Sequence, residues 1–225
     1  MTVEEYKKEE YSPAISISTN QTIVKILELM KMTASNFKNY LICGYYTKQQ
    51  LNEPDLFQTY LQQATKLIRK FGYPFNIDKE YQDIYFENKG FSDLYFYTNE
   101  EDESNVSIFS IECKRLPAPP PKSREQEYVK GNNNNGGIER YKKEIHGKGL
   151  NECGMLGFVE KETFPFWHQN INTWILDLSY TDAFWQANER LWEVESEKDF
   201  AVLKSIAHRM SQKDMRLYHL WVNIQ

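Results

Sequence analysis

Three runs of alternating apolar and polar residues between positions 76 and 116 constrain the fold more than any other feature of the sequence. The segments 76–87, 91–97 and 106–116 read with period two, which is typical of strands that bury one face. The turns between them are too short for the crossovers that join parallel strands. We therefore expect an antiparallel three-stranded meander.

Helical patterns flank this meander. One helix is predicted over 19–32 and a second over 55–71, where Pro54 suits the first turn and Gly72 lies just past the end. A short helix over 138–145 and a buried strand over 154–160 follow the meander. The sequence thus predicts an α/β fold with a central mixed sheet flanked by helices. Its core has the order αβββαβ over about residues 53–160.

The last third of the chain, residues 161–225, is expected to pack on this core as a helical and β extension. A helix is predicted over 164–179, a weaker helical stretch over 183–192, and a hairpin formed by 200–208 and 215–224. In the second hairpin strand Leu217, His219, Trp221 and Asn223 would share one face. We expect one domain over residues 1–225, because the strands before residue 117 need the later elements for burial.

Residues 117–137 separate the meander from the elements that follow. Proline, glycine, asparagine and charged residues dominate this segment, as in PAPPPKSREQEYVKGNNNNGG. Such a composition favours a mobile loop. We expect the loop to close over a substrate.

The cysteines and the N-terminal sequence indicate in which cellular compartment the protein is expected. Cys43, Cys113 and Cys153 lie far apart, with no CxxC pair, which argues against a disulfide framework or a zinc site. The N-terminus is charged where a signal peptide would be apolar, and no apolar run is long enough to span a bilayer. We expect a cytoplasmic protein that does not contact a membrane.

The charge of the chain is unevenly distributed. The net charge is −5, but residues 114–148 hold nine Lys and Arg against four Asp and Glu. A basic segment on an acidic body is compatible with a nucleic-acid partner, and equally with a solvated loop. The residues expected to contact nucleic acid are Arg140, Lys122, Arg124 and Lys130.

The candidate for chemistry is a group of two acids and an amine on adjacent strands. Glu112 and Lys114 are two apart in a strand and share a face, while Cys113 turns into the core. Asp93 lies on the preceding strand. Carboxylates are the ligands that Mg²⁺ prefers, and a divalent cation assists phosphodiester hydrolysis. Asp93, Glu112 and the backbone carbonyl of Cys113 are therefore candidate ligands of Mg²⁺ or Mn²⁺, and Lys114 is the candidate for holding the attacking water.

This arrangement resembles the PD-(D/E)xK nuclease superfamily, which has the restriction-endonuclease-like fold. The resemblance rests on Asp93 in one strand, Glu112-Cys113-Lys114 at the end of the next, and the order of elements around them. It implies a Mg²⁺-dependent endonuclease that acts on DNA, with Asp93, Glu112 and Lys114 as catalytic residues. Several members carry a further acid on the preceding helix. No obvious acid occupies that helix here, and Glu53 and Glu80 are distant candidates.

Two other interpretations stay open. The first is a nuclease-like fold that no longer cuts and acts as a nucleic-acid or protein binding module. The second is a scaffold whose Trp-rich last third forms an oligomer interface. A homodimer is compatible with each of these interpretations and with the nuclease.

Overall fold

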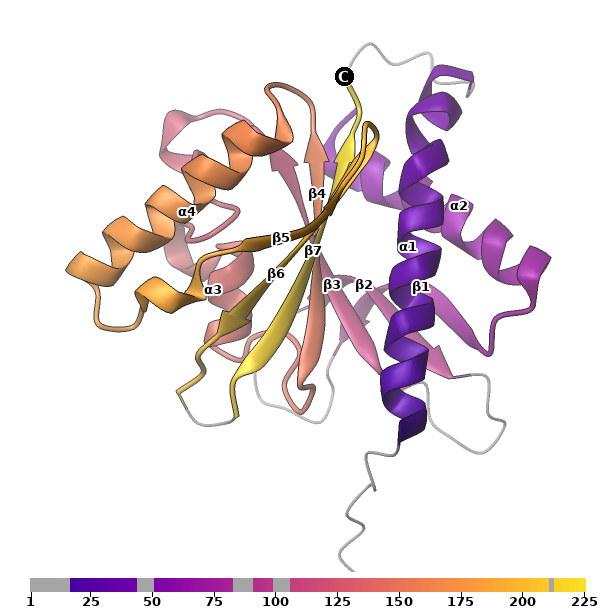
Figure 1. The fold of residues 1–225 in the computed structure, drawn as a ribbon, viewed down its shortest axis with the longest axis horizontal. Helices are drawn as coiled ribbons and strands as arrows, with labels where there is room; N and C mark the ends of the chain where they lie inside the picture. Colours follow the sequence, from indigo (N-terminus) through magenta and orange to yellow (C-terminus); the bar gives the residue numbers. More distant parts are fainter. Residues whose placement is uncertain (1–16, 44–50, 83–90, 99–105, 211–212) are drawn as a thin grey trace, which may run out of the picture.

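The computed structural model describes residues 17–43, 51–82, 91–98, 106–210 and 213–225. Within these residues one mixed sheet of seven strands lies between two layers of helices (Figure 1). Four α-helices are described: α1 (Ile17–Cys43), α2 (Glu53–Phe71), α3 (Gly137–Lys142) and α4 (Phe164–Thr181). Helices α1 and α2 cover one face of the sheet, and α3 and α4 cover the other. The protein is an α/β protein, as predicted.

The sheet has the strand order β1-β2-β3-β4-β7-β6-β5. The strands are β1 (Phe75–Gln82), β2 (Phe91–Thr98), β3 (Phe109–Leu116), β4 (Glu152–Val159), β5 (Trp192–Ser196), β6 (Phe200–Ala207) and β7 (Met215–Asn223). β1, β2 and β3 form the predicted antiparallel meander, and β3–β4 and β4–β7 are parallel. The order αβββαβ from α2 to β4 is confirmed, and the predicted hairpin of β6 and β7 extends the same sheet.

Helix α2 begins earlier than predicted because its cap lies at Asn52. The Asn52 side chain accepts the N–H of Asp55 at 2.8 Å, and the Asp55 carboxylate accepts the N–H of Asn52 at 3.3 Å. This capping box satisfies backbone groups that a helix start leaves unpaired. Gly72, at φ 65°, ends the helix in the left-handed conformation that favours glycine. As a result Glu53 lies inside the first turn, directed at the carboxyl end of β3.

Strand alternation distributes the core over two layers. In β3, Phe109, Ile111 and Cys113 lie in the core under α1 and α2, which leaves Glu112 and Lys114 on the opposite face. In β7, Leu217 and Trp221 lie in the core on the α3 and α4 side of the sheet. The alternate residues of the strand, which begin with Tyr218, lie in the core under α1. The predicted faces of both strands are confirmed, because side chains in a strand alternate between the two faces of the sheet.

Several element boundaries differ from the prediction. The helix expected over 19–32 continues to Cys43, because Ala34 and Phe37 extend its buried face. The helical stretch expected over 183–192 is wrong: only a 3₁₀ turn, Ala187–Glu189, forms there before β5 begins. The strand expected over 76–87 ends at Gln82, and its remaining residues lie outside the described part of the chain.

The segment 117–137 is not the mobile loop that its composition predicts. It contains two 3₁₀ turns, Lys122–Arg124 and Asn132–Asn134, and Tyr128 and Val129 are fully buried. The Tyr128 hydroxyl is hydrogen-bonded to Nδ1 of His219 and accepts from Nε1 of Trp221, both at 2.9 Å. These contacts attach the middle of the segment to β7, which local composition cannot reveal.

The buried His219 ring predicts acid-sensitive stability. Full burial lowers the pKa of His219 from 6.5 to about 3. As the pH falls through 6.5, His219 takes up a proton in the unfolded chain but stays neutral in the folded protein. The stability that the neutral buried ring provides is therefore complete above pH 6.5 and is lost as the pH falls from 6.5 toward 3. We expect His219 to reduce the free energy of unfolding at pH 5 by about 2 kcal/mol relative to pH 7.5.

Urea unfolding at these two pH values tests this expectation. His219→Gln should lose less stability between pH 7.5 and pH 5 than the wild type does. His168→Gln, at a half-buried ring on α4, is the matched control and should behave as the wild type. Equal losses in the wild type and His219→Gln would exclude His219 as the source.

Candidate active site

The candidate site lies where β2 and β3 separate. Their ladder pairs Leu94 with Ile111, and in the same register the next pair would be Asp93 and Glu112. Instead, the Asp93 carboxylate accepts the N–H of Cys113 at 2.7 Å. Both backbone groups of a strand residue point toward the same neighbouring strand, so the Cys113 carbonyl faces the gap that Asp93 borders. The sheet thus brings together the two acids and the carbonyl that the sequence singled out.

Glu112 is the centre of the charged cluster. Its side chain is fully buried, and its Oε1 accepts from Lys114 Nζ and from Arg140 Nη1, each at 2.6 Å. Its Oε2 has no hydrogen-bond partner among the described residues, and His146 Nε2 lies 3.8 Å from it. One carboxylate oxygen is therefore held by two cations while the other is buried and unused.

The acids of the site respond differently to burial. Desolvation, followed by the charge of Glu112, raises the pKa of Asp93 from 3.8 to about 8. Burial also acts to raise the pKa of Glu112, but Lys114, His146 and Arg140 together hold it below its usual value. Burial lowers the pKa of His146 to about 4, so its ring is neutral at neutral pH. Without a further cation, Asp93 is protonated and Glu112 is ionised near pH 7.

Glu53 is the acidic residue beside the candidate site that the sequence analysis undervalued. Its Oε2 accepts the N–H of Arg115 at 3.2 Å, and desolvation by burial raises its pKa. The charge of Lys114 opposes that shift, and the charge of Glu112 adds to it, so the three groups interact electrostatically. The signal was present: the Asn52–Asp55 capping box moves the helix start back to Glu53. Glu80, the other candidate, is exposed on β1, which β2 separates from β3 in the sheet.

The donor set suits a hard divalent cation. Asp93, Glu112 and Glu53 offer carboxylate oxygens, the ligands that Mg²⁺ and Mn²⁺ prefer. The unpaired Glu112 Oε2 and the raised pKa of Asp93 both reflect negative charge that a cation would stabilise. The described residues nevertheless form no group of three or more His, Cys, Asp or Glu side chains placed to hold a metal ion. Lys114 and Arg140 occupy Oε1 of Glu112 in this structure.

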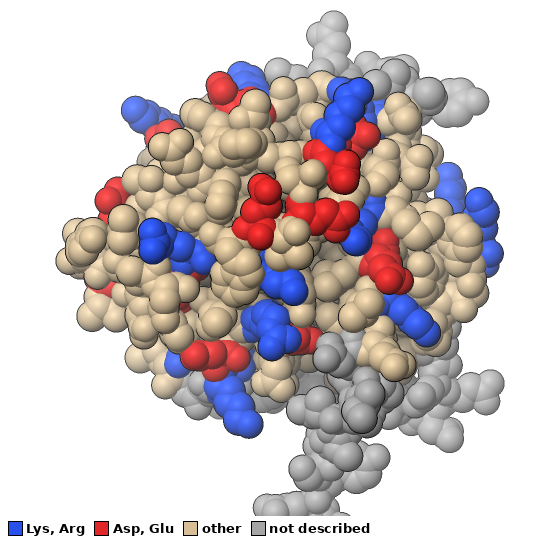
Figure 2. All heavy atoms as spheres, in the orientation of Figure 1, with Lys and Arg blue, Asp and Glu red and all other residues tan. Residues whose placement is uncertain are grey.

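The residues predicted to contact nucleic acid fall in different places. Arg140 lies in the charged cluster itself, with a side chain 25% exposed. Arg124 is paired with Glu127 at 2.7 Å and Lys130 with Asp182 at 2.9 Å, whereas Lys122 is exposed. On the face shown in Figure 2, Lys and Arg are interspersed with Asp and Glu and are not gathered into one basic patch. The local excess of positive charge is therefore partly balanced by acids elsewhere in the fold.

Comparisons with known proteins returned no match. Neither protein-family models, nor curated proteins, nor solved structures match this chain. In the part of the chain that the structure describes, no helix is long and apolar enough to cross a membrane. Two of the three cysteines, Cys113 and Cys153, are buried free thiols.

Proposed function

We propose that this protein is a Mg²⁺-dependent nuclease with a restriction-endonuclease-like fold, and that its substrate is DNA. The observation that carries the proposal is the meeting of half-buried Asp93 with buried Glu112 and Lys114 where β2 and β3 separate. Glu53 joins this cluster from α2, a helix on which several members of the resembling family carry a further acid. The order αβββαβ from α2 to β4 supports the same assignment.

Each residue has a role that its contacts support. Asp93, Glu112 and the Cys113 carbonyl would hold the cation, with Glu112 Oε2 as the open oxygen. A bound Mg²⁺ would polarise the phosphate and lower the pKa of a bound water. Lys114, whose pKa stays raised despite burial because of Glu112, Glu53 and Asp93, carries a permanent positive charge to hold the attacking water. Arg140, partly exposed beside Glu112, can turn toward the phosphate.

Cleavage assays with matched variants test this proposal. We expect the wild type to cut DNA in Mg²⁺ or Mn²⁺ but not in EDTA. The substrates are linear, supercoiled and single-stranded DNA, and RNA is tested in parallel. Asp93→Ala and Lys114→Ala should each lower cleavage by roughly 100-fold or more. Asp78→Ala and Lys79→Ala remove the same side-chain types from exposed positions on neighbouring β1 and should cut as the wild type does. Wild-type protein that cuts none of these substrates would overturn the proposal.

A binding module without catalysis is the second candidate. The observation that favours it is the pairing of Glu112 with Lys114 and Arg140, because this cluster is already satisfied at Oε1 without a metal. Calorimetric titration with Mn²⁺ distinguishes the two. Binding that Asp93→Ala removes supports the nuclease, whereas nucleic-acid binding with no metal binding supports the module.

A further inference from the structure

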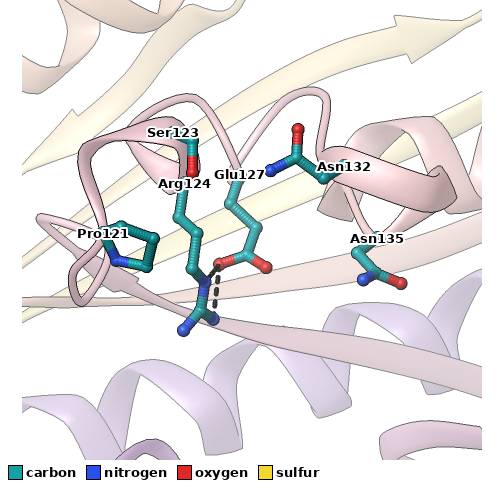
Figure 3. Close-up of a pocket in the computed structure, with 6 residues that line it drawn as sticks. All are labelled: Pro121, Ser123, Arg124, Glu127, Asn132 and Asn135. Carbon is teal, nitrogen blue, oxygen red and sulfur yellow. Dashed lines mark hydrogen bonds and ion pairs between the residues drawn. The ribbon is translucent and has the colours of Figure 1, made fainter.

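A polar pocket of about 230 Å³ lies within the segment 117–137. Its lining residues are Pro121, Ser123, Arg124, Glu127, Asn132 and Asn135. Figure 3 shows Arg124 and Glu127 joined to each other, with the Asn132 amide directed toward Glu127 and Asn135 further along the same turn. The volume is below the roughly 300–1,000 Å³ of pockets for drug-sized ligands. The pocket therefore suits a single ring system better than a larger molecule.

The asparagine wall of the pocket is held in a specific conformation. Gly131 and Gly136 touch at the neck of this turn, where a Cβ on Gly131 would lie 2.6 Å from the nitrogen of Gly136. The carboxylate of buried Glu139 accepts the N–H groups of both glycines, at 3.2 and 3.4 Å. Between them Asn133 and Asn134 have φ values of 56° and 64°, in the left-handed region that asparagine tolerates. A turn closed in this way presents Asn132 and Asn135 at defined positions.

The opposite wall carries no net charge. Glu127 accepts from Nε of Arg124 at 2.9 Å and is 2.7 Å from Nη2, so the two charges balance inside the pocket. Phosphate-binding sites rely on unbalanced positive charge and on the salt-sensitive attraction that it produces. Asparagine amides, in contrast, both donate and accept hydrogen bonds, and they pair with base edges. The lining thus suits a neutral polar heterocycle better than a phosphate.

The pocket is adjacent to the candidate active site. The charge of Glu127, on the wall of the pocket, contributes to the raised pKa of Glu53 in the candidate site. The backbone carbonyl of Glu127 also accepts the N–H of Gly137 at 2.9 Å, at the start of the helix that carries Arg140. A nucleic acid whose phosphate lies at Asp93 and Glu112 can therefore place a neighbouring base at this pocket.

We propose that this pocket binds one nucleobase of the nucleic acid, next to the phosphodiester at the Asp93–Glu112–Lys114 cluster. This inference rests on the proposed function for the position of the strand. It adds that Asn132 and Asn135 make the protein sensitive to the base at one position. The protein therefore recognises a base at one position in addition to the backbone charge.

Binding to oligonucleotides with a single missing base tests the inference. Fluorescence anisotropy in EDTA, where no cleavage is expected, would follow labelled single-stranded and duplex DNA in which one abasic site is moved along the sequence. At one position or two adjacent positions, the abasic site should weaken wild-type binding by about tenfold or more. In Asn132→Ala/Asn135→Ala that penalty should disappear. Asn133→Gly removes an amide from the same turn but not from the pocket, and should keep the full penalty.

The outcomes separate this inference from the proposed function. The proposal that this pocket binds a base would be overturned by an equal abasic penalty in the wild type and the double variant. It would also be overturned if no abasic site weakens wild-type binding, or if the wild type does not bind DNA at all. Base-dependent binding without Mg²⁺-dependent cleavage would overturn the proposed nuclease activity and support base binding by the pocket. Thermal unfolding followed by circular dichroism checks that the double variant is folded. If it is not, Asn132→Ala and Asn135→Ala are tested singly, and each should reduce the penalty.

Discussion

Glu112→Gln is expected to abolish metal-dependent cleavage and to lower the free energy of unfolding by about 3–5 kcal/mol. The side chains of Glu112 and Lys114 are 0% and 9% exposed, so the substitution leaves the Lys114 ammonium buried without its counter-charge. It also removes one of two carboxylates proposed to hold the cation. Urea unfolding at pH 7.5 and the cleavage assay measure the two effects separately.

A second variant separates the structural from the catalytic loss. Glu112→Gln/Lys114→Met removes both buried charges and should recover much of the stability, because a buried pair adds little beyond the apolar groups that replace it. Cleavage should stay absent. Glu193→Gln, at an exposed position on β5, is the control for the loss of one carboxylate. An unchanged free energy of unfolding in Glu112→Gln would mean that the Lys114 contact contributes nothing to the fold, and unchanged cleavage would remove Glu112 from the reaction.

Glu189→Gln should produce a loss of stability of similar size, about 3–5 kcal/mol, without affecting the active site. Glu189 is ion-paired with Lys142, and both side chains are 0% exposed. Glu189 also accepts the N–H groups of His208 and Gln186, each at 2.8 Å. The Lys142 ammonium lies 4.7 and 4.9 Å from the ring centroids of Phe184 and Trp185, in a site that excludes water. Removing the carboxylate leaves that ammonium without a counter-charge.

Thermal unfolding checks this prediction, with a decrease in Tm of roughly 6–20 °C expected for a chain of this size. Below the unfolding transition, cleavage per folded molecule should equal that of the wild type. Lys142→Met/Glu189→Leu should recover part of the stability. A Tm within one degree of the wild type would show that the pair is dispensable, and a specific loss of cleavage would connect it to the active site.

The face on which the catalytic candidates lie could be predicted from β3 alone. Period-two alternation directs Cys113 into the core and leaves Glu112 and Lys114 together, whatever the neighbours of the strand. Short turns determine the antiparallel meander in the same way, and Gly72 determines the end of α2. These features depend on backbone geometry within a few residues, so a single sequence contains them.

Long-range contacts explain what could not be predicted. Glu53 reaches the site through a hydrogen bond to Arg115, 62 residues later in the chain. The Tyr128 hydroxyl is hydrogen-bonded to His219 and accepts from Trp221, 91 and 93 residues away, and these contacts override a composition typical of a mobile loop. The pairing of Arg140 with Glu112 likewise depends on where α3 packs against β3.

The sequence by itself determined the αβββαβ order and the shared face of Glu112 and Lys114, because hydrophobic periodicity and turn length act locally. Only the tertiary structure decided that Glu53 joins the cluster, that Glu112 keeps one unpaired buried oxygen, and that the asparagine turn forms one wall of a pocket. Those outcomes follow from desolvation and from contacts between distant segments, which no local pattern encodes.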